Sequence, residues 1–113
     1  MARYIVVEVY PEELLDKVVE KISKTFETMV GIGLIKGRLI IADRIKNRII
    51  LRVPTRYLKY ARYAILTVSK IDNRKVATIT ISVTGTIRKA RAQARSLPHI
   101  LSQDSNLSSS PLR

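Results

Sequence analysis

Residues 3–29, RYIVVEVYPEELLDKVVEKISKTFETM, determine the fold of this chain of 113 residues. The first part, residues 3–10, is rich in β-branched and aromatic residues that alternate between two faces, which predicts a strand. Pro11 then opens a segment whose apolar residues recur every three or four positions from Leu15 to Met29, which predicts an amphipathic helix. A strand joined directly to such a helix indicates a sheet with helices packed against it.

The remaining elements are predicted by the same patterns. Residues 38–43 and 48–53 predict two strands joined by a short hairpin, and a second helix is predicted from Pro54 to about Val68. A long strand is predicted at residues 75–84, after a turn. The residues of this strand that we expect to face the core are Ala77, Ile79, Ile81 and Val83.

A further helix follows, so the predicted order is β-α-β-β-α-β-α within one domain. Two helices that return by right-handed crossovers onto one antiparallel sheet predict a ferredoxin-like, two-layer α/β sandwich, to which the last helix is an addition. The second face of the sheet is only half apolar, which leaves open whether the last helix covers it. We expect the domain to span residues 1–97 and the serine-rich tail, residues 98–113, to be disordered.

The segment most informative about function is residues 82–95, SVTGTIRKARAQAR, which joins the last strand to a strongly basic helix without any acid. Thr86 is a suitable N-cap, and a helix N-terminus offers backbone amides and a positive dipole end to a phosphate. Arg88, Arg91 and Arg95 follow at helical spacing and form one stripe, and guanidinium groups hold phosphate in bidentate pairs. The predicted apolar stripe of this helix is Ile87, Ala90, Ala94 and Leu97. The pattern favours contact with RNA or DNA over a merely solvated basic face.

The charge of the chain supports this interpretation. Residues 1–43 carry six Lys/Arg and seven Asp/Glu, a net charge of −1, whereas residues 44–103 carry fourteen Lys/Arg and a single acid, a net charge of +13. Such clustering costs a compact protein self-repulsion, which a polyanionic partner offsets. Nucleic acid is therefore favoured over the alternative that the charge serves only solubility.

The predicted RNA contacts extend beyond the arginine stripe. Arg48 and Arg52 on the second face of the sheet, together with Lys75, are interpreted either as a continuation of the basic surface or as ordinary exposed residues. The full set of predicted RNA-binding residues is Gly85, Thr86, Arg88, Lys89, Arg91, Arg95, Arg48, Arg52 and Lys75.

The sequence offers little for catalysis or metal binding. It contains no cysteine, which excludes disulfides and thiolate chemistry, and its one histidine, His99, falls in the predicted tail. The loop GIGLIKG at residues 31–37 lacks the residue order of a phosphate loop and follows a helix instead of a strand. No apolar run reaches the roughly 20 residues that cross a membrane. We expect a cytoplasmic protein without a metal or cofactor of its own, and we assign no catalytic residue.

Residues 83–91, VTGTIRKAR, resemble the V-S-G-T-I-K/R-K/R-A segment of the Pop-five subunit of ribonuclease P, which is called protein component 2 in archaea. The opening RYIVVEV, the segment GLIKGRLIIAD at 33–43 and the strand and helix at 48–71 resemble the same family in the same order. Thr84 stands where the family has Ser and keeps the hydroxyl group. The hairpin at 44–47 is basic where members of the family often carry acids.

The resemblance implies a function that composition alone does not. Ribonuclease P removes the 5′ leader of precursor tRNA, and its RNA subunit performs the hydrolysis with bound magnesium. Members of the family support the catalytic RNA and bind a barrel-shaped protein subunit of the Rpp-thirty type. In archaea they form a two-plus-two heterotetramer around a dimer of the Pop-five subunit. The expected function is therefore an RNA-binding accessory subunit of this endonuclease. The alternative is a protein-interaction module of the same fold, as in the related Rpp-fourteen subunit, with incidental RNA contact.

Overall fold

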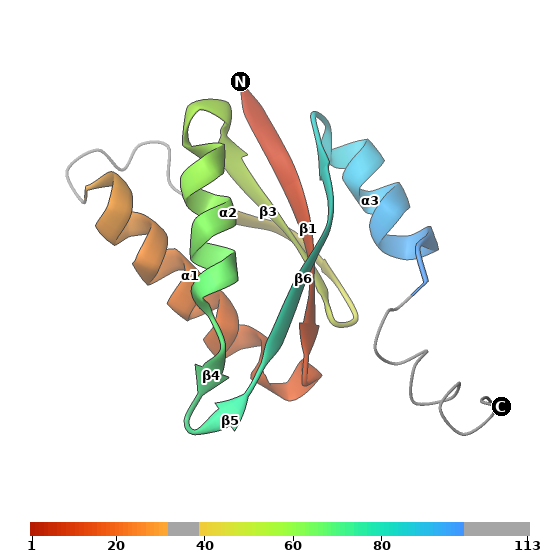
Figure 1. The fold of residues 1–113 in the computed structure, drawn as a ribbon. Helices are drawn as coiled ribbons and strands as arrows, with labels where there is room; N and C mark the ends of the chain where they lie inside the picture. Colours follow the sequence, from red (N-terminus) through yellow and green to blue (C-terminus); the bar gives the residue numbers. More distant parts are fainter. Residues whose placement is uncertain (32–38, 99–113) are drawn as a thin grey trace, which may run out of the picture.

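The computed structural model describes residues 1–31 and 39–98, which form a four-stranded antiparallel sheet with helices on both faces (Figure 1). The strand order is β2-β3-β1-β6, with α1 and α2 on one face and α3 on the other. The elements are β1 (Ala2–Tyr10), α1 (Leu15–Val30), β2 (Ile40–Ile45), β3 (Arg48–Pro54), α2 (Leu58–Thr67), β4 (Lys70–Ile71), β5 (Arg74–Lys75), β6 (Ala77–Thr84) and α3 (Ile87–Ser96). The predicted α+β sandwich is confirmed, and the element order fits the ferredoxin-like topology with one added helix.

The main core lies between the sheet and the helices α1 and α2. Alternate residues of β1 and β3 point into it, as predicted, and Phe26 of α1 is fully buried. The ring of Phe26 meets that of Tyr57 edge-on, with centroids 6.3 Å apart. The buried strand residues are Ile5, Val7, Val9, Ile49, Leu51 and Val53. α1 ends at Gly31, whose φ of 89° is in the region that favours glycine.

α3 covers the second face of the sheet through a smaller apolar cluster. Val6 and Ile50 of the sheet pack there against Ala90 and Ala94 of the helix. Alanine side chains allow the helix backbone to approach the sheet closely, so the half-apolar face is covered after all. Leu97 was expected in the same stripe but is 37% exposed, because the helix ends one residue before it and the backbone turns away.

β6 contains a bulge that inverts part of the predicted alternation. Ser82 and Thr80 lie opposite consecutive residues of β1, so Ile81 is the extra residue. Thr78 therefore faces α2, where its hydroxyl donates to a backbone carbonyl at 3.0 Å, whereas Ile81 packs beneath α3. Of the four β6 residues predicted to face the main core, Val83 does pack against it. The prediction is wrong for Ile81, and also for Ala77 and Ile79, which lie opposite Tyr10 and Glu8 on the second face. Hydrophobic alternation contains no signal for a bulge, so it could not predict this inversion.

A short hairpin of β4 and β5 precedes β6 and packs near the start of the first helix. Its turn is Asp72–Asn73, as the sequence predicts, and both residues have positive φ, 51° and 67°. Two ion pairs anchor the hairpin: Lys17 Nζ lies 2.6 Å from Asp72 Oδ2, and Arg74 Nη2 lies 2.9 Å from Glu13 Oε2. The hydrogen bonds from these cations hold the pKa of Asp72 and the pKa of Glu13 below their ordinary values.

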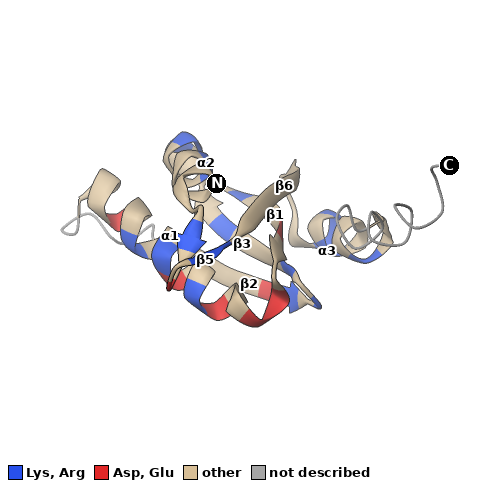
Figure 2. Ribbon diagram, turned by 60° about the horizontal axis from the view of Figure 1, so that its bottom comes forward, with Lys and Arg blue, Asp and Glu red and all other residues tan. Residues whose placement is uncertain are grey.

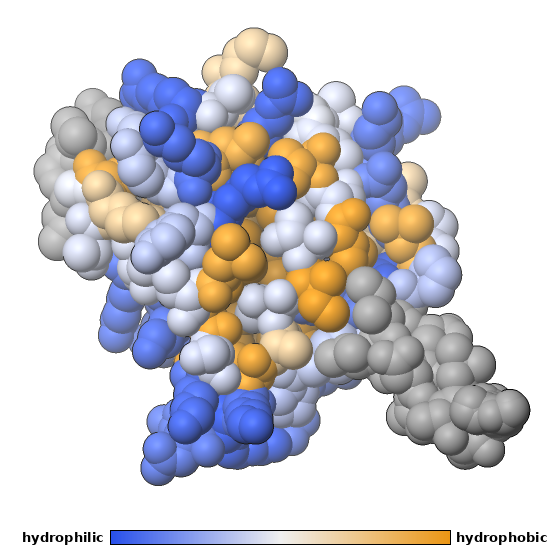
Figure 3. Space-filling model, in the orientation of Figure 1, coloured by the Kyte–Doolittle hydropathy of each residue, from blue (hydrophilic) through white to orange (hydrophobic). Residues whose placement is uncertain are grey.

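The two edges of the described sheet differ in charge. β2 carries Asp43, Arg44 and a bulge, which are features that commonly protect an edge from pairing with other strands. β6, with the sequence ATITISVT, contains neither a charged residue nor proline. Figure 3 shows apolar side chains on the surface over β6, between α2 and α3.

Candidate nucleic-acid interface

The basic helix α3 begins at a hydrogen-bonded turn. The Thr86 hydroxyl accepts a hydrogen bond from the backbone amide of Lys89 at 3.2 Å, which confirms the predicted N-cap. The Thr84 hydroxyl donates to the Thr86 carbonyl at 2.9 Å and fixes the turn from β6 into the helix. The start of α3 is therefore held rigidly against the end of β6, with the positive end of the helix dipole at the surface.

The arginine stripe of α3 lies largely at the surface. Arg88, Lys89 and Arg95 are exposed, whereas Arg91 is half-buried. By helical spacing Lys89 points away from the stripe. Figure 2 shows these cations on α3 as a group on the side of the molecule opposite α1.

An acid from β2 lies against this stripe. Arg91 Nε donates to Asp43 Oδ2 at 2.9 Å, and the backbone amide of Arg44 donates to Asp43 Oδ1 at 2.8 Å. The Arg44 amide first, and then the Arg91 guanidinium, hold the pKa of Asp43 below its ordinary value. The sequence segment contains no acid, but the fold supplies one, so Arg91 is partly neutralised in the protein without RNA.

Arg48 does not belong to the exposed basic surface. Its side chain is 0% exposed, and its Nη2 lies 2.7 Å from Glu8 Oε1. The prediction that Arg48 extends the surface available to RNA is therefore wrong. The alternation of β3 correctly directs Arg48 to the second face of the sheet, but α3 covers that face.

The two other predicted RNA contacts, Arg52 and Lys75, lie in different parts of the structure. Arg52 is exposed, and it lies opposite Tyr4, which packs against the cluster beneath α3. Directly opposed residues point to one face, so Arg52 shares the face of α3 and lies at the end where α3 begins. Lys75 lies on β5, beyond the end of β6 that is farther from Gly85, and Figure 1 shows β5 well apart from α3. Lys75 therefore does not join the surface formed by α3.

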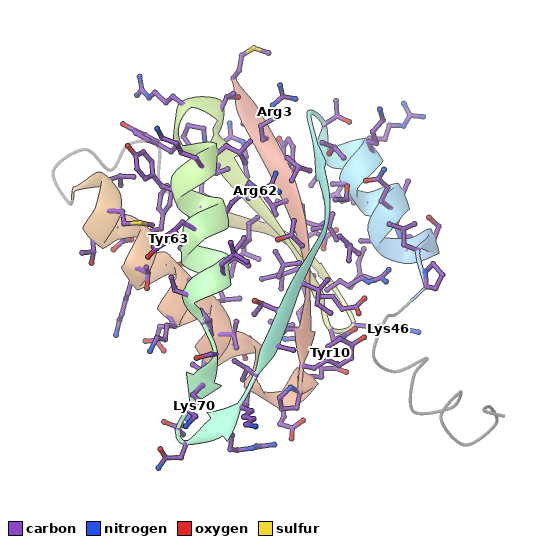
Figure 4. All side chains as sticks on the ribbon, viewed as in Figure 1. Arg3, Tyr10, Lys46, Arg62, Tyr63 and Lys70 are labelled. Atoms are coloured by element: carbon purple, nitrogen blue, oxygen red, sulfur yellow. The ribbon has the colours of Figure 1, made fainter. Side chains whose placement is uncertain are left out.

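Sequence reasoning missed Arg3, which lies beside the turn into α3. Its Nη1 is 3.3 Å from the position that a Cβ would take on Gly85, and Figure 4 shows it at the start of β1. The sequence could have indicated this position, because antiparallel pairing of the first and last strands places the start of β1 beside the end of β6. Arg3 and Arg52 thus flank the start of the arginine stripe.

The described residues contain no group of histidine, cysteine and acidic side chains that could hold a metal ion. No helix in the described part of the chain is both long and apolar enough to span a membrane. The chemistry that this site offers is the binding of anions by guanidinium and ammonium groups.

Among curated proteins no significant match to the chain was found. The model of the Rpp14/Pop5 family matches residues 3–95, which run from β1 to the last turn of α3 and so include the whole described sheet and the arginine stripe. The chain therefore belongs to the Rpp14/Pop5 family of ribonuclease P protein subunits.

Proposed function

We propose that the protein is an RNA-binding accessory subunit of ribonuclease P that supports the catalytic RNA during removal of the 5′ leader of precursor tRNA. The observation that carries the proposal is the stripe of Arg88, Arg91 and Arg95 on a helix fixed against the sheet. Membership of the family identifies ribonuclease P RNA as the proposed partner, and the stripe carries guanidinium groups suited to bind the phosphates of this RNA.

The proposed role of these cations is electrostatic. Phosphates of the folded RNA repel one another, and arginines held in a fixed row reduce this repulsion where strands approach. Magnesium is then bound and used by the RNA, while the protein orders the RNA around it. We further propose a cytoplasmic location, contact with precursor tRNA in the holoenzyme, and assembly with the barrel-type Rpp-thirty subunit in a two-plus-two complex.

Removal of the stripe tests the proposal. The variant Arg88→Ala/Arg91→Ala/Arg95→Ala should bind ribonuclease P RNA more weakly, and the slope of log affinity against log salt should decrease by about 0.7–0.9 for each phosphate that the variant no longer neutralises. The matched control is Arg56→Ala/Lys59→Ala/Arg62→Ala, which removes three exposed charges at the start of the second helix and within it. Equal affinity and slope for the stripe variant and the wild type would refute the site.

A second candidate function is a protein-interaction module. Tyr63 and Leu66 of α2 are 58% and 77% exposed, and their spacing of three residues makes them neighbours on one face of the helix. Figure 4 shows Tyr63 on the α1 side of this helix and Arg62 on its β1 side. If protein contact is the main function, capture of the barrel-type subunit should survive nuclease treatment and be abolished in Tyr63→Ala/Leu66→Ala, while the stripe variant behaves as the wild type.

A further inference from the structure

The C-terminal turn of α3 has a carbonyl group that its own helix cannot satisfy. The carbonyl of Ala94 would accept a hydrogen bond from the amide four residues later, but that residue is Pro98, which has no N–H. The buried Arg48 of β3 supplies the missing donor: its Nη1 lies 2.9 Å from the Ala94 carbonyl oxygen. Its Nη2 donates to the carbonyl of Pro98 at 2.7 Å. A cation at the C-terminal end of a helix also interacts favourably with the negative end of the helix dipole.

The same guanidinium is held from the sheet. Arg48 Nε donates to Glu8 Oε1 on β1 at 2.8 Å, and the Tyr10 hydroxyl donates to the other oxygen of this carboxylate. Arg48 and Glu8 are both 0% exposed. One planar group thus joins β1, β3 and the end of α3, which a lysine cannot do because its single nitrogen does not span three acceptors that lie apart.

This network fixes the orientation of the helix. α3 also contacts the sheet through Ala90 and Ala94, whose small side chains bury little apolar surface, and through Ile87 in the same cluster. Two polar contacts add to these, the Arg91–Asp43 pair and the hydrogen bond from Ser82 to Gln93. Arg48 is the contact that holds the last carbonyls of the helix. A buried ion pair contributes little net stability compared with apolar residues of similar size, but it defines one geometry. The arginine stripe lies on the same helix: Arg95 directly follows Ala94, and Arg91 and Arg88 precede Ala94 by three and six residues.

We propose that Arg48 is a positioning residue of the RNA interface: it does not touch RNA, but it holds α3 at the angle at which Arg88, Arg91 and Arg95 reach phosphates together. The inference rests on the proposed function, because Arg48 acts only through the stripe.

Two variants separate positioning from folding. Arg48→Lys keeps a cation beside Glu8 but removes the hydrogen bonds to the helix carbonyls. Glu8→Leu/Arg48→Met replaces the pair by apolar residues and avoids an unpaired buried charge. Both should keep the wild-type circular dichroism spectrum and unfold cooperatively, yet amide hydrogen exchange of α3 should become faster. The matched control is Arg74→Lys, which changes an exposed arginine–glutamate pair far from α3.

The decisive measurement is a double-mutant cycle on RNA binding, with ribonuclease P RNA as the probe. In the wild-type chain, Arg48→Lys should lower the salt slope by about 0.7–0.9 for each phosphate that the displaced stripe fails to reach. In the chain that already lacks the three arginines of the stripe, the same change should alter affinity by less than about twofold.

The outcomes distinguish the inference from the proposed function. If removal of the stripe itself leaves RNA binding unchanged, the proposed function is wrong. If removal of the stripe weakens binding but Arg48→Lys does not, only the positioning role is wrong. An equal loss of affinity from Arg48→Lys with and without the stripe would also overturn the positioning role, because Arg48 would then act through another surface or through stability.

Discussion

Replacement of Asp43 by asparagine should strengthen RNA binding, although it removes an ion pair. Asp43 accepts hydrogen bonds from Arg91 Nε at 2.9 Å and from the Arg44 amide at 2.8 Å. Asparagine has the same shape and its side-chain oxygen can still accept from the Arg44 amide. The main change is that Arg91 loses its anionic partner and becomes available to phosphate.

The magnitude follows from the exposure of the pair. The side chains of Arg91 and Asp43 are 43% and 32% exposed, so the pair resembles a surface ion pair, which contributes about 0.2–1 kcal/mol. This interaction must be broken before Arg91 can bind phosphate. Its removal should therefore raise RNA affinity about 1.4- to 5-fold, at 1.4 kcal/mol per factor of ten. The stability of the protein should fall by no more than about 1 kcal/mol.

Fluorescence anisotropy with labelled ribonuclease P RNA over a series of salt concentrations measures the effect. Asp16→Asn is the matched control, since it also adds one unit of net charge but leaves the Arg91–Asp43 pair intact. It removes the charge of one of the two acids near Arg44, Asp16 and Glu12. An equal gain in both variants would show that net charge alone is responsible. A loss of affinity in Asp43→Asn would refute the reasoning, because the ion pair would then orient Arg91 for RNA instead of competing with it.

Three further predictions concern stability. Gly31→Ala should lower the free energy of unfolding by about 1 kcal/mol or more because of the positive φ at this position. Gly85→Ala should change it by less than about 0.5 kcal/mol, since the added methyl group meets only the flexible end of an arginine side chain. Urea unfolding compares the two variants. In the same assay, Ile50→Ala should lower the free energy of unfolding by about 2–5 kcal/mol, because Ile50 is buried in the apolar cluster beneath α3. Ile40→Ala, at a side chain 46% exposed, should lower it by less than about 0.5 kcal/mol. Similar losses of stability in the two variants would contradict the packing of this cluster. The hydrogen bond from Lys17 lowers the pKa of Asp72 in the folded protein. The stability that this ion pair contributes is therefore complete above the ordinary carboxyl pKa of about 4, and it is lost as the pH falls through the lower pKa of the folded protein. The protection of the β4–β5 amides against hydrogen exchange, taken relative to the intrinsic exchange rate at each pH, should therefore fall below about pH 4, and a fall already at pH 6 would refute this cause.

The sequence was sufficient for the three helices, the four strands of the main sheet and the stripe on α3, but it did not predict the small β4–β5 sheet. Strand alternation and helical spacing are local properties, so Phe26 and Thr86 were placed correctly from nearby residues alone. The errors arise where distant segments meet. Arg48 is directed to the correct face of the sheet by its position, but its burial depends on how far α3 extends over that face. The contact of Asp43 with Arg91 depends on the register of β2, which local patterns do not contain.

The uncharged edge formed by β6 has a consequence for the protein in solution. Most edge strands carry their own charges, which keep other strands from pairing with them. β6 has a bulge but no charge of its own, so its electrostatic protection comes from the rest of the molecule, whose net charge of +12 drives two copies apart before their edges meet. Phosphate groups neutralise this charge, and added salt screens it. The edge is therefore best shielded in the free protein at low salt, and least shielded when a polyanion has covered the basic surface.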